Sequence, residues 1–248
     1  MKTETHGPLD NHLLASLSLT DFSRISSLLK GLEYKQGLVL VEPGDEVEHV
    51  YFPYSGMISL LAVTKDGKAV ETATVGREGV VGAMAGLGLH TSLARAVVQV
   101  PMVGSQIASA PFRKMVQESI ALRDLVIKYN EVLLAQVQTT AACNALHHVE
   151  ARLSRWILQT RDRLDTDTVP LTQEFLAEML GVRRTSVSEV ANKLQSAGLI
   201  SYIRGVIQIV DRSALEKKSC ECYQTILEKS AQILPHIQRQ AHNDRAFD

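Results

Sequence analysis

Ten polar side chains between residues 172 and 204 have the chemistry and the spacing of a surface that contacts DNA. They combine cationic groups, which bind phosphate or guanine, with hydroxyl, amide and carboxylate groups, which contact phosphates and base edges. In chain order they are Thr172, Arg183, Arg184, Thr185, Ser186, Ser188, Glu189, Asn192, Lys193 and Arg204. Positions 184, 185, 188, 189 and 192 share one face of a helix, which the sequence predicts to enter a major groove.

The segment from residue 171 to residue 200 predicts the two helices that such a surface requires. Thr172 is a suitable N-cap for the first helix, and Gly181 can take the positive φ that ends it. Val187 and Leu194 lie on the inward face of the second helix. Two short helices joined by a glycine are also common in all-α proteins, so this segment alone leaves both interpretations open.

The next segment favours DNA binding. Residues 199–203 and 206–210 are rich in β-branched residues and are separated by Arg204-Gly205, which predicts a hairpin. A helix-turn-helix followed at once by a hairpin is a winged helix.

Upstream, the chain predicts a small β domain behind a helical N-terminus. We expect residues 10–34 to be helical, with Thr20 or Asp21 as the cap. From Tyr34 to about Ile107, short β-rich runs alternate with turn signals about every ten residues, which indicates an antiparallel barrel or sandwich.

A helix from about Ile120 to His147 follows a helical stretch that begins at Pro111. It carries a seam with alternating spacings of four and three, which we interpret as a dimer interface. The seam consists of Leu122, Val126, Tyr129, Leu133, Gln136 and Thr140, and Cys143 and His147 continue it. A helix that packs these residues on its own β domain is the alternative.

The rest of the chain completes an α+β organisation with four parts. We expect a helix at Ala151–Leu164, a loop at Asp165–Val169 and a helical extension at Ser213–Gln240, interrupted by Pro235. The predicted parts are a β-roll sensor domain (1–119), the dimerisation helix (120–147), the winged helix (148–212) and the C-terminal extension (213–248).

Composition sets limits on these interpretations. In 248 residues, three cysteines are too few for a disulfide scaffold, and no apolar run approaches the ~20 residues of a membrane span. The first residues lack the pattern of a signal peptide, so we expect a cytoplasmic protein. Residues 148–215 contain nine Arg or Lys and eight Asp or Glu residues, so any basic surface depends on local placement.

The order of β-roll, long helix and winged helix resembles the Crp/Fnr family of bacterial transcription regulators, over about residues 10–212. Two segments carry the resemblance: EPGDEVEHVYFPYSGMISLLAVTKDG, similar to the family's β-roll, and LTQEFLAEMLGVRRTSVSEVANKLQSAGLI, similar to its helix-turn-helix. The resemblance implies a homodimer that binds double-stranded DNA at a pseudo-palindromic operator. It also implies contact with RNA polymerase if the protein is an activator.

The family's cyclic-nucleotide cassette is altered here. Members that bind cyclic nucleotide use a Glu for the ribose hydroxyl and an Arg followed by Ser or Thr for the phosphate. The corresponding residues are Gly82, Ala83, Met84, Arg95 and Ala96. Because Ala83 replaces the Glu and Ala96 replaces the hydroxyl residue, we expect no ordinary binding of cAMP or cGMP. The sequence does not identify the effector. Glu78, in a turn several residues earlier, is the alternative acceptor for the ribose hydroxyl.

The recognition helix also departs from the family pattern of Arg, Glu and a second Arg four residues later. The matching positions are Arg184, Thr185 and Glu189, which predicts a different operator. Arg184 keeps the ability to contact guanine with two hydrogen bonds.

Other effector chemistry has little support in the sequence. Cys143 stands alone in the long helix, where a small apolar role is expected. The segment Cys220-Glu221-Cys222 has no second cysteine pair to complete a tetrahedral metal site, and His236 is the candidate for a third ligand. We therefore expect no metal and no cofactor.

Two other functional classes are weighed against a regulator. One is a ligand-binding module whose winged helix contacts protein rather than DNA, and DNA affinity separates the two. The other is an enzyme, for which the sequence offers no paired carboxylates, nucleophile elbow or phosphate loop.

Overall fold

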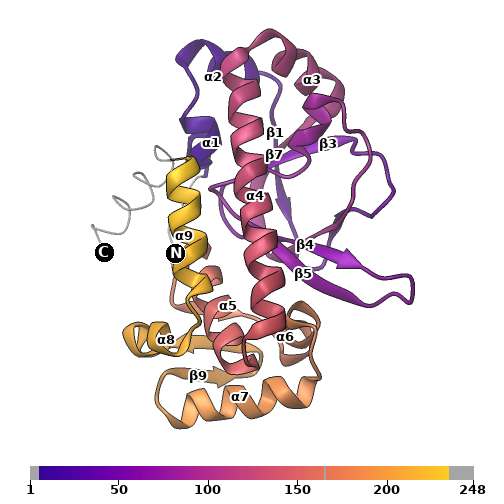
Figure 1. Ribbon diagram of the computed structural model, residues 1–248. Helices are drawn as coiled ribbons and strands as arrows, with labels where there is room; N and C mark the ends of the chain where they lie inside the picture. The colour runs from indigo at the N-terminus through magenta and orange to yellow at the C-terminus, as the bar shows by residue number, and fades with distance from the viewer. Residues whose placement is uncertain (1–5, 165, 235–248) are drawn as a thin grey trace. The chain divides into compact units, whose positions relative to one another are not determined.

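The computed structural model describes residues 6–164 and 166–234 (Figure 1). The chain forms two compact units that do not follow chain order. The first unit comprises the chain up to Leu60, Thr74–Ala135 and the chain from Glu228, and the second comprises Leu61–Ala73 and Gln136–Leu227. Within the described ranges, no helix has the length and apolar character needed to cross a membrane.

Antiparallel strands form the body of the first unit, as the alternating pattern predicts. One sheet has the order β1 (Lys30–Tyr34), β7 (Met102–Ala108) and β3 (His49–Pro53). The other has the order β2 (Val39–Val41), β6 (Arg95–Val100), β4 (Met57–Val63) and β5 (Ala69–Val75), and its residues 61–73 belong to the second unit. The expected α+β class with an N-terminal antiparallel β-roll is confirmed.

The N-terminal segment differs from the expected continuous helix. It forms a 3-10 turn (η1, Pro8–Asp10) and two short helices, α1 (His12–Ala15) and α2 (Leu19–Ser26). Ser18, rather than Thr20 or Asp21, caps α2 by accepting a hydrogen bond from the Asp21 amide at 3.1 Å. Residues 30–34 form β1, since pairing with β7 overrides the local helical pattern.

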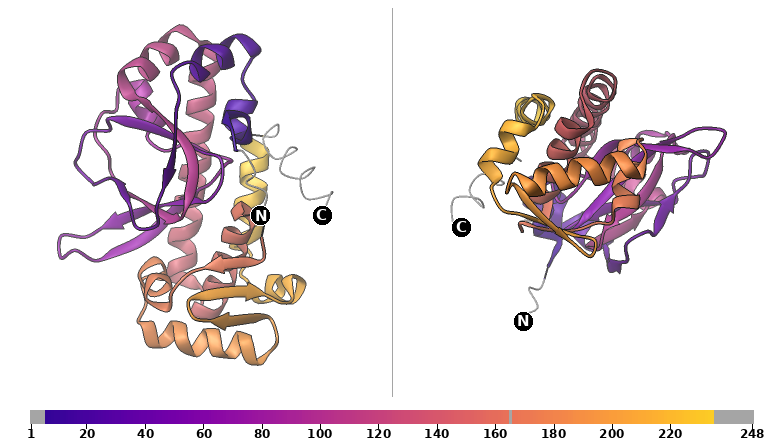
Figure 2. Two further views of the ribbon diagram at one scale, coloured as in Figure 1. Left: turned by 180° about the vertical axis from the view of Figure 1, so that it is seen from behind. Right: turned by 90° about the horizontal axis from the view of Figure 1, so that it is seen from below.

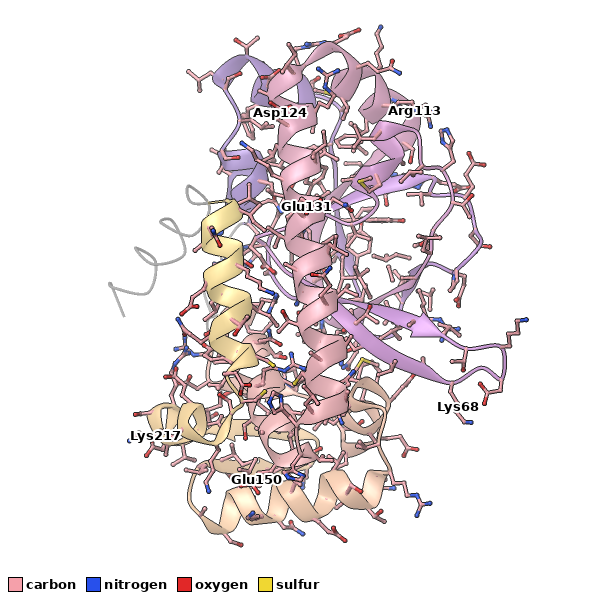
Figure 3. The ribbon with its side chains drawn as sticks, viewed as in Figure 1. Lys68, Arg113, Asp124, Glu131, Glu150 and Lys217 are labelled. Atoms are coloured by element: carbon pink, nitrogen blue, oxygen red, sulfur yellow. The ribbon has the colours of Figure 1, made fainter. Side chains whose placement is uncertain are left out.

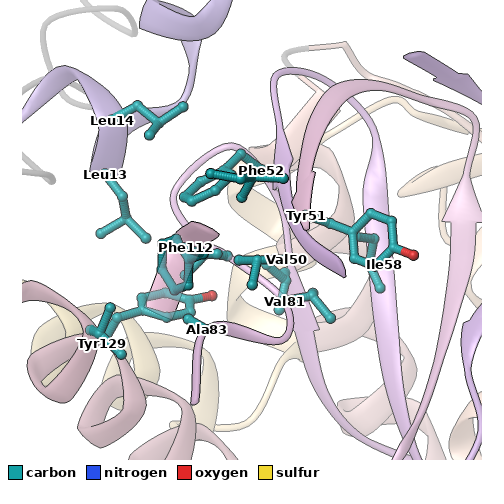
Figure 4. Packing of buried hydrophobic residues seen from close by; sticks show 14 of the residues in the cluster. Leu13, Leu14, Val50, Tyr51, Phe52, Ile58, Val81, Ala83, Phe112 and Tyr129 are labelled. Carbon is teal, nitrogen blue, oxygen red and sulfur yellow. The ribbon is translucent and has the colours of Figure 1, made fainter. Parts of the chain in front are cut away.

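Two helices follow the roll. The first is α3 (Ser109–Glu118), and the second is the expected long helix, α4 (Ile120–Leu146). The Ser119 hydroxyl accepts a hydrogen bond from the Leu122 amide at 3.1 Å, which satisfies a free donor at the start of α4. The core of the first unit gathers side chains from β3, α3 and α4, including Phe52, Phe112 and Tyr129 (Figure 4).

The second unit contains the winged helix. Its helices are α5 (Val149–Leu164), α6 (Gln173–Leu180), α7 (Arg184–Ser196), α8 (Arg212–Lys218) and α9 (Cys222–Ile233), which continues into the first unit. Its sheet has the order β8 (Thr168–Pro170), β10 (Val206–Ile209) and β9 (Ile200–Ile203), seen beside α7 in Figure 2.

The segment before the helix-turn-helix differs from the expected loop. Thr168 and Val169, expected in a loop, belong to β8 because their backbone pairs with β10. Asp165 and Pro235 lie outside the described residues.

Candidate nucleic-acid interface

The first helix of the helix-turn-helix begins and ends as its sequence predicts. The Thr172 hydroxyl accepts a hydrogen bond from the Phe175 amide at 3.3 Å, so Thr172 is the N-cap of α6. Gly181 ends α6 with φ at 62°, a conformation that strongly favours glycine. Leu176 and Leu180 of α6 are buried, and their packing fixes the position of the helix.

The second helix, α7, buries one face and exposes the other. Val187, Ala191 and Leu194 are buried, whereas most of the expected DNA contacts are exposed. The exposed ones on and just before α7 are Arg183, Arg184, Thr185, Glu189, Asn192 and Lys193. Ser186 and Ser188 are half-buried, and the Ser188 hydroxyl donates to the Gln173 side-chain oxygen at 2.6 Å. Ser188 therefore helps to hold α7 against α6.

The wing is a tight hairpin that is tied to the helices. Arg204 and Gly205 have φ of 50° and 78°, as a two-residue hairpin turn of type I′ requires. The Tyr202 hydroxyl donates to the Leu171 carbonyl at 2.9 Å, and the Tyr202 amide donates to the Gln195 side chain at 2.7 Å. These bonds fix the wing relative to both ends of the helix-turn-helix.

A hollow of about 480 Å³ lies between the start of α6, the start of α7 and the wing. Its lining consists of Thr172, Gln173, Glu174, Arg184, Tyr202, Arg204 and Gly205. Three of the ten predicted DNA contacts, Thr172, Arg184 and Arg204, thus meet at one concave surface, and two of them are arginines. Burial raises the pKa of the Tyr202 phenol, while the charge of Arg184 opposes that rise, so the ring enters the hollow as a neutral hydrogen-bonding group.

The two cations of α7 differ in their intramolecular partners. Arg184 lies 3.8 Å from the Glu174 carboxylate, and both side chains are largely exposed, so a phosphate or a base can replace that weak contact. Lys193 is paired with Glu150 of α5 and lowers the pKa of that carboxyl through their hydrogen bond. Glu150 also lies 3.7 Å from Lys218. Sequence reasoning missed that Lys193 already has a structural partner.

A second candidate site is a cavity of about 380 Å³ in the first unit. The predicted pocket residues Gly82, Ala83, Met84 and Ala96 line it, together with residues of α4 that include Tyr129 and Leu133. Tyr129 reaches the segment that contains Ala83 (Figure 4). That segment is a short 3-10 helix, η2 (Ala83–Leu87).

Arg95, expected in this pocket, is not among its lining residues. Its Nε lies 2.8 and 3.1 Å from the two carboxylate oxygens of Glu42. The cation that was expected to bind a phosphate is therefore paired with a carboxylate just after β2.

The expected dimer seam on α4 faces the chain's own core. Leu122, Val126 and Tyr129 are each only 3–4% exposed, and Leu133 packs on the same cluster. Gln136 and Thr140 are buried as well. The prediction that these side chains contact a partner is therefore wrong, because they are already buried within their own chain.

A different face of α4 is exposed and apolar. Ile120, Ile127 and Leu134 recur every seven residues and are 67%, 46% and 45% exposed. Asp124 and Glu131, which project from α4 toward the viewer in Figure 3, alternate with them. The four-three spacing of these five residues is that of a coiled-coil seam.

The three cysteines, which sequence analysis treated separately, lie together with His147. Their ligand atoms and those of His147 are all within 4.8 Å of one another. Cys143 Sγ lies 3.4 Å from Cys220 Sγ, and Cys222 Sγ lies 3.6 Å from His147 Nδ1. The expectation that Cys143 stands alone is wrong, while His236 lies outside the described residues.

Comparison with known proteins agrees with this geometry. The family model described as a Crp-like helix-turn-helix domain matches residues 151–218, and that described as a cyclic nucleotide-binding domain matches residues 32–119. The nitrogen fixation regulation protein FixK of Bradyrhizobium diazoefficiens is 23% identical over 212 residues, which cover 82% of this chain and 87% of FixK.

Solved structures show the same fold. FixK2 from Bradyrhizobium japonicum superposes with a TM-score of 0.66 at 14% identity, over 77% of this chain and 98% of FixK2. The c-di-GMP responsive global regulator CLP from Xanthomonas campestris gives 0.64 at 17% identity, over 77% of this chain and 99% of CLP.

Proposed function

Because the chain belongs to the Crp/Fnr family of transcription regulators, we propose that it reads a specific DNA operator as a homodimer. The observation that supports this most directly is the hollow that brings Arg184 of α7 and Arg204 of the wing to one exposed surface. Arg184 begins the recognition helix, where it can place its guanidinium on a guanine edge, while Arg204 reaches the phosphate backbone. A symmetric dimer would place two such surfaces on the two half-sites of a pseudo-palindrome.

The dimer contact in this proposal is the exposed seam of Ile120, Ile127 and Leu134. Apolar residues that repeat every seven positions bury their side chains best against a second copy of the same helix. The acidic residues at the alternate seam positions, Asp124 and Glu131, would pair with Lys128 of the partner helix.

The effector in this proposal is not an ordinary cyclic nucleotide. Ala83 gives the cavity no acceptor for a ribose hydroxyl, and Arg95, the expected phosphate ligand, is paired with Glu42. If the protein activates transcription, RNA polymerase is a further partner. Catalytic activity is not part of the proposal.

Selection of bound sites from a random pool of DNA duplexes tests the proposal. The full chain should enrich one two-fold symmetric sequence whose half-sites are about one helical turn apart, centre to centre. Adding cell extract to a parallel selection would detect dependence on a small effector. If no sequence is enriched at moderate salt, the winged helix is a protein-interaction domain and the proposal is wrong.

A further inference from the structure

The four side chains of the sulfur-rich cluster have the composition of a closed zinc site. Cys143 lies in the last turn of α4 and His147 directly follows that helix, with its amide donating to the Cys143 carbonyl, while Cys220 and Cys222 lie just before and at the start of α9. Three thiolates and an imidazole form one of the common ligand sets of structural zinc. In the part of the chain that the structure describes, all three cysteines are buried and free.

The distances within the cluster suit a single tetrahedral ion. Bonds of about 2.3 Å to sulfur and about 2.0–2.1 Å to nitrogen put the ligand atoms about 3.5–3.8 Å apart. The separations of 3.4 Å for Cys143 Sγ to Cys220 Sγ and 3.6 Å for Cys222 Sγ to His147 Nδ1 are close to that range. Because all the ligand atoms lie within 4.8 Å of one another, they surround a point rather than the two sides of an iron–sulfur cluster.

His147 has the outer partner that metal-bound histidines usually have. Its Nε2 lies 3.2 Å from the Glu221 carboxylate, so Nδ1 is the nitrogen that faces the sulfurs. A carboxylate on the far nitrogen fixes the tautomer and the orientation of the ring. Glu221 stands between Cys220 and Cys222, so one short segment supplies two ligands and this partner.

Two cationic side chains, Arg152 and Arg155, interact electrostatically with Cys143 of the cluster. Arg152 and Arg155 of α5 are buried, and their hydrogen bonds go to uncharged groups, the Leu180 carbonyl and the Gln159 side chain. The Nε of each has no hydrogen-bond partner among the described residues. Buried cations need nearby negative charge, and a zinc ion with three thiolates and a neutral imidazole carries a net charge of −1.

We infer that Cys143, His147, Cys220 and Cys222 form a structural zinc site, which fastens the start of α9 to the last turns of α4. All four ligands come from the protein, so no position is left for a substrate or water, as in structural rather than catalytic zinc sites. The two ligand pairs are separated by more than 70 residues of chain, and they enclose the whole winged helix. The ion would close this loop and stabilise the unit that carries α7.

The first test measures metal in the full chain, purified under reducing conditions without chelator. Elemental analysis should find about one zinc ion per chain, and chelator treatment should release it. After replacement by Co²⁺, the visible and near-ultraviolet spectrum should show a tetrahedral ion with thiolate ligands. A metal-free reduced chain that binds neither ion would overturn the inference, as would a Cys143–Cys220 disulfide as the resting state.

Neighbouring histidines provide a matched pair of variants. His147→Ala should abolish stoichiometric zinc binding, whereas His148→Ala, one residue along and outside the cluster, should keep it. Glu221→Gln leaves all four ligands in place and should weaken zinc binding by roughly 10–100-fold, as measured by chelator competition. This variant keeps the test decisive if His147→Ala does not fold. Equal metal content in the two histidine variants would contradict the assignment.

Discussion

At the scale of single residues, Arg184 is the side chain on which sequence specificity depends most in our proposal. Its guanidinium is exposed, and its acidic neighbour Glu174 holds it weakly at 3.8 Å. Arg184→Ala should therefore remove one bidentate base contact and cost roughly 1–3 kcal/mol of discrimination at a single base pair of each half-site. Binding to a set of operators substituted at each position would measure this loss.

Lys193→Ala is the control for that prediction. Lys193 is also an exposed cation of α7, but its ammonium group is paired with Glu150. Its removal should weaken binding to all sequences by a similar small factor and leave the order of preferred bases unchanged. A preference that is unaltered by Arg184→Ala, or altered as strongly by Lys193→Ala, would refute the assignment of roles.

Sequence analysis could predict the groove-facing residues because they follow a local period. The exposed face of α7 and the caps of α6 depend only on residues within a few positions of one another. The partners that occupy some of these side chains are distant in sequence. Ser188 bonds Gln173, 15 positions away, and Lys193 pairs with Glu150, 43 positions away. No periodic pattern encodes such contacts.

At the scale of elements, α4 explains why the predicted dimer seam was misplaced. The helix is apolar on two faces, since one packs on the β-roll and the other is exposed. Both faces have a regular helical repeat, with Leu122, Val126 and Tyr129 four and three positions apart on one and Ile120 and Ile127 seven positions apart on the other. Periodicity alone cannot tell which face covers its own domain, and only the burial of each residue separates them.

Leu134→Asp tests the exposed seam as the dimer interface. Leu134 is 45% exposed, so an aspartate there keeps the fold of the single chain but places two carboxylates together in the proposed dimer. The variant should sediment as a monomer at concentrations at which the unaltered protein is a dimer. Leu19→Asp makes the same substitution in α2, at a side chain that is 89% exposed and outside the seam, and should stay dimeric. An intact Leu134→Asp dimer would exclude this face.

The packing of α4 on the roll depends on a glycine. A Cβ at Gly79 would lie 1.8 Å from the Tyr129 hydroxyl oxygen and 2.4 Å from the adjoining ring carbon. Gly79→Ala should therefore force α4 or its tyrosine to shift, and it should lower the free energy of unfolding by about 1–3 kcal/mol, measured in urea.

Gly31→Ala is the matched control for this effect. Gly31 lies in β1, where a Cβ would have no heavy atom within 4 Å, so its replacement should leave stability nearly unchanged. Equal effects at Gly79 and Gly31 would show that loss of backbone freedom, rather than contact with α4, dominates.

At the scale of the whole molecule, the feature hidden from the sequence is how distant segments combine. Residues 61–73 belong to the unit of the winged helix, and the chain from Glu228 belongs to the unit of the roll. The cluster of Cys143, Cys220 and Cys222 arises in the same way, since Cys143 and Cys220 are 77 positions apart in the sequence. Sequence spacing therefore predicted a lone Cys-x-Cys pair where folding assembles four ligands.

The response of the whole molecule to cyclic nucleotides follows from two of its residues. A cyclic nucleotide in the cavity of the first unit would bury an anionic phosphate, which needs a cation in contact with it. The expected cation, Arg95, is held by Glu42, and Ala83 leaves the ribose hydroxyls without an acceptor. Titration calorimetry with cAMP or cGMP should therefore show no binding at micromolar concentrations.

Ala83→Glu sharpens this prediction, because it restores the acceptor but not the cation. We expect the variant to remain unresponsive, since the phosphate would still face the apolar cavity while Arg95 stays paired with Glu42. Micromolar binding by the unaltered protein would mean that Arg95 exchanges Glu42 for the phosphate. Binding by Ala83→Glu alone would mean that the hydroxyl acceptor, rather than the cation, is the missing group.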